Sequence, residues 1–185
     1  MIKASAAGRI CLFGEHQDYL GLPVIPMAIN LRVEITGESR SDNQVIVNLP
    51  DISSIERFEL SKDELVYTKN RDYFKSCMNV LSRNDYKWNK GFECTVKGNI
   101  PINSGTSSSS ALNSAWCKFL IEISDSGDKN ISNQEIAQLN YLAEVVEFKE
   151  AGGMMDQYST AMGGLLFIEF EPTILVRSIN ANREP

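Results

Sequence analysis

The stretch Gly98-Asn-Ile-Pro-Ile-Asn-Ser-Gly-Thr-Ser-Ser-Ser-Ser-Ala-Leu112 organises the interpretation of this chain. It follows an alternating segment, residues 92–97, and leads into an apolar helical pattern that begins at Ala111. Gly105 allows a sharp turn or a close approach to a ligand, because glycine has no Cβ. Backbone N–H groups at the start of a helix have no intrahelical partner and lie at the positive end of its dipole. The stretch therefore predicts a strand, a loop and a helix, with a loop that can bind an anion such as phosphate.

The serines of this loop also have a simpler interpretation. Serine is favoured at helix N-caps whatever the function, and a Gly/Ser loop alone is a weak signal. Serine hydroxyls can in addition reach a hydrated cation, since Mg²⁺ prefers oxygen ligands. The choice between an N-cap and a phosphate site depends on the rest of the chain.

Length and composition indicate one ordinary globular domain. The chain has 185 residues, which suits a single domain with a proper core. The fractions of hydrophobic and charged residues, 43% and 23%, are typical of such a domain. The formal net charge of -6 argues against a broad nucleic-acid surface. A local phosphate site stays compatible with this charge, because backbone amides can supply positive potential.

The cysteines and the absence of long apolar runs indicate the compartment. None of the cysteines has a close metal-ligand spacing, and three lie in apolar runs that predict buried free thiols in a reducing compartment. No run is long enough to cross a bilayer, and no signal peptide is visible. We therefore expect a cytoplasmic protein without a membrane partner. The four cysteines are Cys11, Cys77, Cys94 and Cys117.

Hydrophobic periodicity predicts strands and helices in a mixed order. A capping box of Ser132 and Glu135 marks the start of one helix. In the segment 22–38, Arg32 and Glu34 are expected on a solvated face. Strands are predicted within residues 3–14, 22–38, 44–49, 58–60 and 92–97, helices at 71–83, 111–123 and 134–149, and a final hairpin at 163–170 and 173–179.

A polar cluster follows the first predicted strand. Arg9 is followed by Glu15, His16 and Asp18 within one short segment. The cluster can be a solvated turn, which is common after a strand. It can also be a polyol site, because carboxylates and an imidazole together accept and donate several hydroxyl hydrogen bonds.

Two further acidic positions have a structural and a functional interpretation. Asp156 follows two glycines and lies beside methionines, where an unpaired carboxylate would be costly. It is either the N-cap of a helix at 157–161 or a group that accepts a proton from a substrate hydroxyl. Glu144 shares a helix with Glu147 and Glu150, so it lies on a solvated acidic face or faces the serine loop as a Mg²⁺ ligand.

Three segments resemble the motifs of galactokinase-type GHMP kinases and occur in that family's order. Ala6-Ala-Gly-Arg-Ile-Cys-Leu-Phe-Gly-Glu-His-Gln-Asp-Tyr19 resembles the first motif. The Gly98–Leu112 stretch resembles the second, phosphate-binding motif. Gly152-Gly-Met-Met-Asp-Gln157 resembles the segment with the catalytic aspartate. The three segments together span nearly the whole chain.

The resemblance implies a fold and a domain organisation. The fold would be α+β, of the ribosomal protein S5 domain 2-like type, with a mixed, mostly antiparallel sheet and helices mainly on one face. Residues 1–185 would form the N-terminal GHMP domain, which binds the substrate and the ATP phosphates. The family's glycine-rich third motif is not visible before Pro185, so the C-terminal GHMP domain is expected to be absent from this chain.

The resemblance also implies roles for individual residues in phosphoryl transfer, where positioning and charge neutralisation dominate. Asp156 would face the attacking anomeric hydroxyl, and Arg9 would stabilise the transferring phosphoryl group. The sugar hydroxyls would be held by Glu15, His16 and Asp18. The ATP phosphates would be cradled by Gly105, Ser107, Ser108, Ser109 and Ser110, with Ser109 and Glu144 as Mg²⁺ ligands.

The implied activity is ATP- and Mg²⁺-dependent phosphorylation of galactose or a related monosaccharide at its anomeric hydroxyl. The loop 15–18 favours a sugar over mevalonate or homoserine. Thr106 replaces a leucine of the family, and Gly152 replaces a cysteine common in galactokinases, so the sugar pocket can differ.

The alternatives are another GHMP sugar kinase, for arabinose, glucuronate or a heptose, and a non-catalytic sugar or nucleotide sensor. We expect weak or no activity from this chain alone, sugar and ATP as its small-molecule partners, and no nucleic-acid partner. The sequence does not indicate an oligomeric state.

Overall fold

The computed structural model describes residues 1–101 and 104–180, so Ile102 and Asn103 of the serine stretch, and residues 181–185, lie outside the described part. The strands are β1 (Ile2–Phe13), β2 (Ile25–Ser39), β3 (Gln44–Leu49), β4 (Ser54–Glu59), β5 (Phe92–Gly98), β6 (Leu166–Glu169) and β7 (Leu175–Ser178). The α-helices are α1 (Tyr73–Arg83), α2 (Ser108–Ile123), α3 (Asn133–Tyr141) and α4 (Met155–Met162). Shorter helical turns are η1 (Asp18–Leu20), η2 (Pro50–Ile52) and η3 (Leu142–Val146), of which η3 is π-helical.

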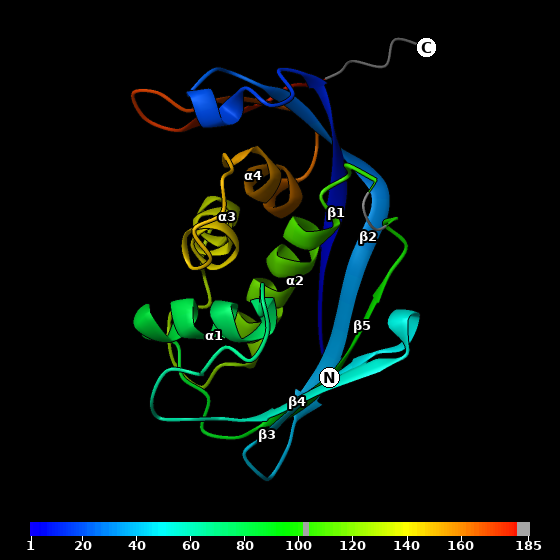
Figure 1. Ribbon diagram of the computed structural model, residues 1–185, viewed down its shortest axis with the longest axis vertical. Helices are drawn as coiled ribbons and strands as arrows, with labels where there is room; N and C mark the ends of the chain where they lie inside the picture. The colour runs from blue at the N-terminus through cyan, green and yellow to red at the C-terminus, as the bar shows by residue number, and fades with distance from the viewer. Residues whose placement is uncertain (102–103, 181–185) are drawn as a thin grey trace.

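A curved sheet forms one layer, and the helices α1 to α4 lie on one of its faces (Figure 1). The strand order is β1-β2-β5-β3-β4, and neighbouring strands are antiparallel except β3 and β5. The strands β6 and β7 form a separate antiparallel hairpin. The expected α+β architecture, with a mostly antiparallel sheet and helices on one face, is confirmed.

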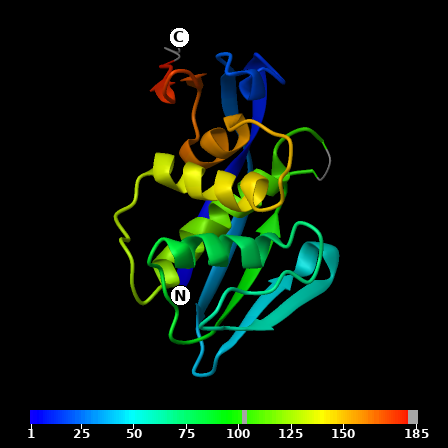
Figure 2. The same ribbon diagram turned by 60° about the vertical axis from the view of Figure 1, so that its left-hand side comes forward.

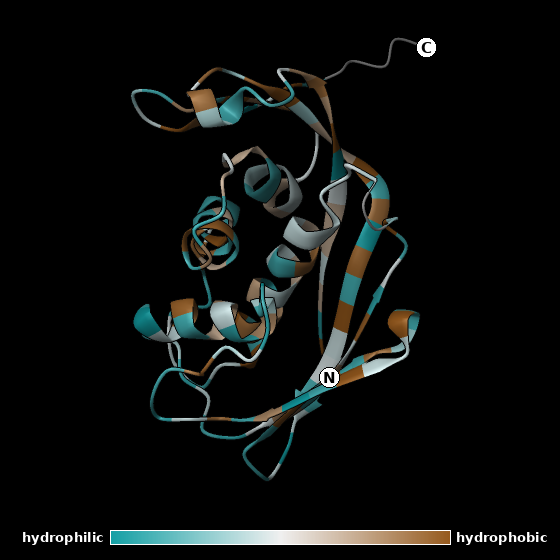
Figure 3. Cartoon of the chain, viewed as in Figure 1, coloured by the Kyte–Doolittle hydropathy of each residue, from teal (hydrophilic) through white to brown (hydrophobic). Residues whose placement is uncertain are grey.

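Alternation along β2 fixes which side of the sheet meets the helices. Val33 and Ile35 are buried, whereas Arg32 and Glu34 are exposed, as the sequence predicts. Figure 3 shows the resulting alternation of hydrophilic and hydrophobic bands along this strand. The period-2 pattern places one set of side chains on the helical side. The segment 22–38 therefore contributes most of one long, continuous strand, β2, to the sheet.

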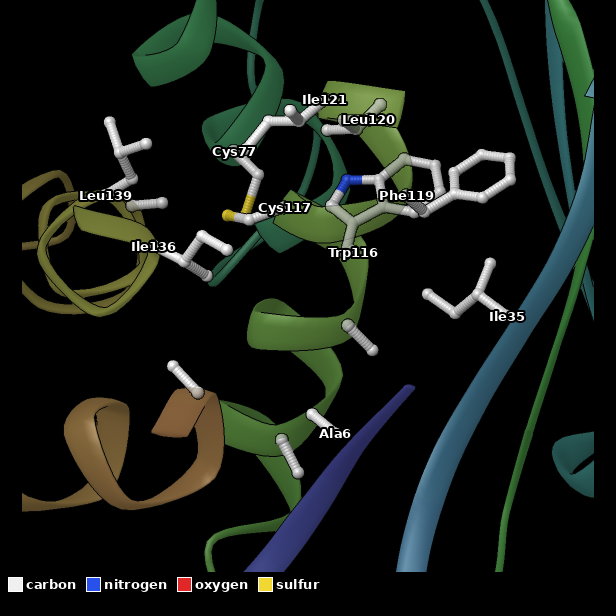
Figure 4. Close-up of a cluster of buried hydrophobic side chains, with 14 of the residues drawn as sticks. Ala6, Ile35, Cys77, Trp116, Cys117, Phe119, Leu120, Ile121, Ile136 and Leu139 are labelled. Carbon is white, nitrogen blue, oxygen red and sulfur yellow. The ribbon is translucent and has the colours of Figure 1, made fainter. Parts of the chain in front are cut away.

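The core lies between the sheet and α2, which is buried on most sides. Trp116 and Phe119 stack with ring centroids 5.6 Å apart, and Phe74 meets Trp116 edge-on at 5.1 Å. Trp116 also donates its indole N–H to the Phe74 carbonyl at 3.0 Å. Figure 4 shows Cys77 beside Cys117 in this cluster. Both thiols and that of Cys94 are free and buried, as predicted.

The bounds of α2 and β4 differ from the predicted ones. The helix α2 begins at Ser108 and not at Ala111, so three serines form its first turn. The strand β4 begins at Ser54, because Leu49 and Ser54 already pair with each other across the turn. It ends at Glu59, one residue before the predicted end.

The predicted helix 134–149 is not one continuous α-helix. The capping box of Ser132 and Glu135 is present, and α3 runs regularly from there. After Tyr141 the chain forms η3, in which the Glu147 N–H donates to the Leu142 carbonyl at 3.0 Å. A π-helical turn inserts one extra residue per turn and is frequent at functional sites. It changes the direction of every side chain that follows, which includes Glu147 and Glu150.

The loop after β1, the hairpin β6–β7 and α4 gather at one end of the sheet (Figure 2). The hairpin is attached to the start of β2, since Val24 and Ile168 exchange backbone hydrogen bonds of 3.0 Å. None of the helices in the described ranges has the length and apolar character that crossing a membrane requires.

Candidate functional site

A cleft of about 370 Å³ opens at this end of the molecule. It lies between the loop after β1, the first turn of α2, η3 and the first turn of α4. A smaller cavity of about 300 Å³, near Met78 and Trp88, contains none of the predicted site residues. The cleft brings together eight of the predicted site residues: Arg9, Glu15, His16, Asp18, Ser109, Ser110, Glu144 and Asp156.

Arg9 lies at the base of the cleft because β1 is irregular just before it. The register shifts between the pairs Ala7–Arg32 and Arg9–Ala28, and such irregularities re-aim side chains. Gly8 permits a close approach to the serine loop, since an added Cβ would lie 3.0 Å from the Thr106 carbonyl. The Arg9 N–H donates to that carbonyl at 3.1 Å. Arg9 itself is 6% exposed.

The Arg9 guanidinium joins the serine loop to α4. Its Nε and Nη2 lie 2.7 and 2.6 Å from Oδ1 of Asp156, and its Nη1 donates to the Gly105 carbonyl at 2.5 Å. Oε1 of Glu15 lies 3.6 Å from Nη2, the same nitrogen that contacts Asp156. A charged pair with hydrogen bonds of this length is strong. The guanidinium therefore fixes the Asp156 carboxylate relative to both neighbouring loops.

Asp156 is not an N-cap, so that interpretation is wrong. Met154 occupies the N-cap of α4, and Asp156 lies in the first helical turn. A carboxylate at this end of a helix is favoured by the dipole. Its side chain is one-third exposed and lies in the cleft. Both Arg9 nitrogens contact Oδ1 of Asp156, so Oδ2 is left to contact a ligand in the cleft.

Asp18 is held against the glycine segment before α4. Its Oδ2 accepts the Met155 N–H at 3.1 Å, and the carboxylate occupies the space where a Cβ on Gly153 would be. Glu15 and His16 are exposed on the same loop, and His16 has a left-handed backbone with φ of 61°. The loop therefore presents two carboxylates and an imidazole to the cleft.

Among the described residues, no acceptor outside α2 bonds to the backbone N–H groups of residues 108–110 in its first turn. Ser107 is the N-cap, as the simpler interpretation expects, but its hydroxyl makes no capping hydrogen bond. That hydroxyl is buried and has no partner within the described residues. Gly105 has φ of 71°, and an added Cβ there would meet nothing within 4 Å. Gly105, Ser107 and Ser108 do not line the cleft, whereas Ser109 and Ser110, which follow them in the first turn of α2, do.

Glu144 is buried, so a solvated acidic face is the wrong interpretation for it. The residue is 7% exposed, and its Oε2 accepts a hydrogen bond of 2.8 Å from Nε2 of Gln157. Burial raises the pKa of Glu144, while hydrogen bonds from Ser109, Ser110 and Gln157 oppose that rise. A buried carboxylate next to serine hydroxyls is a suitable ligand for a hard cation.

A buried hydrogen-bond network ties α2 to the helices beside it. Nδ2 of Asn140 donates to the Ser110 carbonyl at 2.9 Å and to the Ser114 hydroxyl at 2.8 Å. The Thr160 hydroxyl lies 2.9 Å from the Ser114 hydroxyl and donates to the Asp156 carbonyl at 2.8 Å. The serine turn and the turn that carries Asp156 are therefore held in one rigid frame.

Sequence reasoning missed several residues of the cleft. Gln157 lies in the quoted glycine segment, and its position next to Asp156 is the one signal that could have identified it. Arg71 and Tyr73 line the cleft from the start of α1. Glu150 lines it too, although the sequence offered it only as a neighbour of Glu144 on a possible solvated face. These three come from segments that meet only in the folded chain.

Comparisons with known proteins agree with this geometry. A family model described as the GHMP kinases N terminal domain matches residues 72–164, which is half of the chain, and a galactokinase galactose-binding signature matches residues 2–38. A galactokinase of Mannheimia succiniciproducens is 31% identical over 164 residues, which cover 88% of this chain and 42% of that protein. The chain thus spans less than half the length of that relative.

Two solved structures extend the similarity. The galactokinase of Lactococcus lactis, solved in complex with galactose, has a TM-score of 0.79 and 26% identity, over 96% of this chain and 47% of that one. A D-glycero-D-manno-heptose 1-phosphate kinase from Bacteriodes thetaiotaomicron has a TM-score of 0.84 over 97% of this chain and 60% of that one. Its 23% identity shows a shared fold alone. Fold, motifs and family model agree, and this chain belongs to the GHMP kinase family.

Proposed function

We propose that this chain is the substrate- and phosphate-binding N-terminal domain of an ATP-dependent sugar kinase. The kinase would phosphorylate the anomeric hydroxyl of galactose or a closely related monosaccharide. The observation that carries the proposal is the contact between Arg9 and Asp156. Through its further contacts with Glu15 and the Gly105 carbonyl, the Arg9 guanidinium links α4 to the loop after β1 and to the loop before α2. A sugar hydroxyl and a nucleotide phosphate bound in this cleft would meet at that pair.

The sugar side is supported by the loop after β1. Glu15, His16 and Asp18 offer several acceptors and one imidazole, a combination that suits neighbouring hydroxyls. The match of residues 2–38 to a galactokinase galactose-binding signature supports a hexose of this class. Asp18 is the most firmly placed of the three, because the Met155 N–H and Gly153 fix its carboxylate.

The phosphate side is supported by the start of α2. Free N–H groups of a helical first turn and its dipole together attract an anion. Ser107 supplies a buried hydroxyl that has no partner among the described residues. Gly105 keeps the loop open, since no atom lies near its absent Cβ. We assign the cradling of ATP phosphates to Gly105 and Ser107, Ser108, Ser109 and Ser110.

A divalent cation fits the charge of the cleft. Its lining includes five carboxylates and two guanidiniums, so a polyphosphate would need further positive charge. Glu144 and Ser109 would hold Mg²⁺ from the protein side, a number of protein ligands that is usual when phosphates supply the rest. Bound there, Mg²⁺ would neutralise phosphate charge during transfer.

The residues of the chain would orient the reactants and accept a proton. Asp156 would accept the proton of the anomeric hydroxyl through Oδ2, which has no hydrogen-bond partner in the described part of the chain. Arg9 would hold this carboxylate in place through Oδ1 and stabilise negative charge on the transferring group. The network of Asn140, Ser114 and Thr160 would keep the two sides at a fixed separation.

A substrate screen tests the proposal. ATP-dependent phosphorylation of galactose, arabinose, glucuronate, a heptose and mevalonate should be measured with the longest form of the protein that contains this chain. We expect turnover with galactose or a close relative, and weak or no turnover from the 185-residue chain by itself. Phosphorylation of mevalonate alone would refute the sugar assignment. Robust turnover by the 185-residue chain would refute its role as one domain of a larger catalytic unit.

A further inference from the structure

An ion pair closes one side of the cleft and involves residues outside the three motifs. Nε and Nη2 of Arg71 lie 2.7 Å from Oε1 and 2.7 Å from Oε2 of Glu150. Arg71 precedes α1, whereas Glu150 lies in the loop before α4, and both line the cleft. The guanidinium remains 54% exposed in this pair, so it is accessible from the cleft.

Two arginines line the described cleft, and Arg71 is the one whose carboxylate partner an incoming anion can replace. Arg9 is buried and is bound by Asp156, Glu15 and the Gly105 carbonyl. Arg71 has a single carboxylate partner among the described residues and is more than half exposed. Exposed ion pairs of this kind contribute little to stability, so an incoming anion can replace Glu150 at small cost.

Arg71 lines the same cleft as the residues assigned to the phosphate and the cation. Ser109, Ser110 and Glu144 line this cleft together with Arg71 and Tyr73. Burial and then the Glu144 carboxylate raise the pKa of Tyr73 to about 12, while Arg71 opposes the rise, which agrees with their shared surroundings. A polyphosphate bound in this cleft would therefore share it with the Arg71 guanidinium.

The backbone of Arg71 is unusual for a residue with a side chain. Its φ is 54°, in the left-handed region, and its carbonyl accepts the Tyr73 N–H at 2.8 Å. A non-glycine residue in this region is strained, and such strain concentrates at ligand-binding positions. The conformation directs the chain into α1 immediately after the cleft wall.

We propose that Arg71 is a further phosphate-binding residue, which Glu150 holds in place until an anion arrives. The phosphate oxygens of a nucleotide in the cleft would accept hydrogen bonds from the two Arg71 N–H groups that now donate to Glu150. The planar fork of arginine matches phosphate as well as carboxylate. This inference rests on the proposed function, because it assumes that the serine side of the cleft binds a nucleoside polyphosphate.

The proposal predicts opposite effects for the two partners of the ion pair. Arg71→Gln removes a phosphate contact and should weaken binding of Mg²⁺-ATP about tenfold, as expected for loss of a charge-assisted hydrogen bond. Glu150→Gln removes the competing carboxylate and one negative charge, so it should tighten binding severalfold. If the pair only fastened two loops together, both substitutions would weaken binding alike.

Isothermal titration calorimetry of Mg²⁺-ATP and of inorganic tripolyphosphate into the 185-residue chain tests this difference. The matched control is Arg40→Gln, because Arg40 forms a similar two-point pair with Asp42 far from the cleft. We expect the control to bind like the wild type, Arg71→Lys to be intermediate, and Arg71→Gln with Glu150→Gln to resemble Arg71→Gln alone.

Two results would overturn the inference while leaving the proposed function intact: wild-type affinity in Arg71→Gln, or weaker binding in Glu150→Gln. Failure of the wild-type chain to bind either probe would refute the phosphate site and the inference together. Thermal unfolding of each variant, compared with Arg40→Gln, separates a binding defect from a folding defect.

Discussion

Two adjacent glycines before α4 should respond to the same substitution in opposite ways. An alanine Cβ at Gly153 would overlap the carboxylate of Asp18 and lie 2.8 Å from its Cβ. At Gly152 the nearest atoms are the methyl groups of Val145, at 3.8 and 4.0 Å, which is ordinary contact. Neither glycine has a positive φ, so backbone strain does not distinguish them. The difference between Gly153→Ala and Gly152→Ala therefore isolates the position of Asp18.

The magnitude follows from the contact that would be lost. Displacement of Asp18 breaks its hydrogen bond of 3.1 Å from the Met155 N–H. A hydrogen bond to a charged group contributes about 1.5–3 kcal/mol, and in a chain of this size each kcal/mol lowers Tm by about 2–4 °C. Gly153→Ala should thus lower Tm by roughly 3–12 °C, whereas Gly152→Ala should leave it unchanged or raise it slightly.

The assay combines thermal unfolding with a galactose titration of both variants. We expect Gly153→Ala to weaken galactose binding about tenfold, because a displaced Asp18 would lose a hydrogen bond to galactose, and a hydrogen bond to a charged group is worth about that factor. Gly152→Ala should bind like the wild type. Equal Tm values and equal galactose affinities for the two variants would show that Gly153 is not needed to accommodate Asp18.

The other predictions concern catalysis, pH and helix capping. Asp156→Asn should reduce turnover of an active form of the protein at least about a hundredfold, as loss of a general base does, and should leave ATP binding largely intact; unchanged turnover would exclude the catalytic role. Burial raises the pKa of Glu144, so its contribution to stability is full at low pH and is lost as the pH rises above 4.5 through the raised value. Wild-type Tm should therefore fall relative to Glu144→Gln over that range, while Mg²⁺-ATP affinity rises in the wild type only; parallel Tm profiles would contradict this. Ser132→Ala should cost about 1 kcal/mol in unfolding free energy, measured by urea denaturation, without changing ligand affinity; a change in affinity would show that α3 positions the site more tightly than its capping box suggests.

The sequence predicts those elements that are specified by hydrophobic periodicity or by contacts between near neighbours in the chain. The alternation around Arg32 and Glu34 identifies β2 and its solvated face, and the capping box of Ser132 and Glu135 identifies the start of α3. The order of the three motifs identifies most residues that line the cleft. These features depend on neighbours in sequence, and so they can be recognised there.

The rest depends on contacts between distant segments. The π-helical turn η3 carries Glu144 into the interior, while Glu147 and Glu150 pair with Arg83 and Arg71. Glu144 is buried and the other two are half-buried, but no pattern in the sequence separates them, because the ion pairs of Glu147 and Glu150 join residues more than 60 positions apart. Arg71 was missed for the same reason.

A sugar and a nucleotide should bind on opposite sides of the contact between Arg9 and Asp156. Backbone amide NMR of the 185-residue chain, titrated separately with galactose and with Mg²⁺-ATP, tests this arrangement. We predict that galactose perturbs the amides of residues 15–18 and 153–156, and that Mg²⁺-ATP perturbs those of residues 105–110. Perturbation by either ligand around the cavity of Met78 and Trp88 instead, or none from either, would contradict this arrangement.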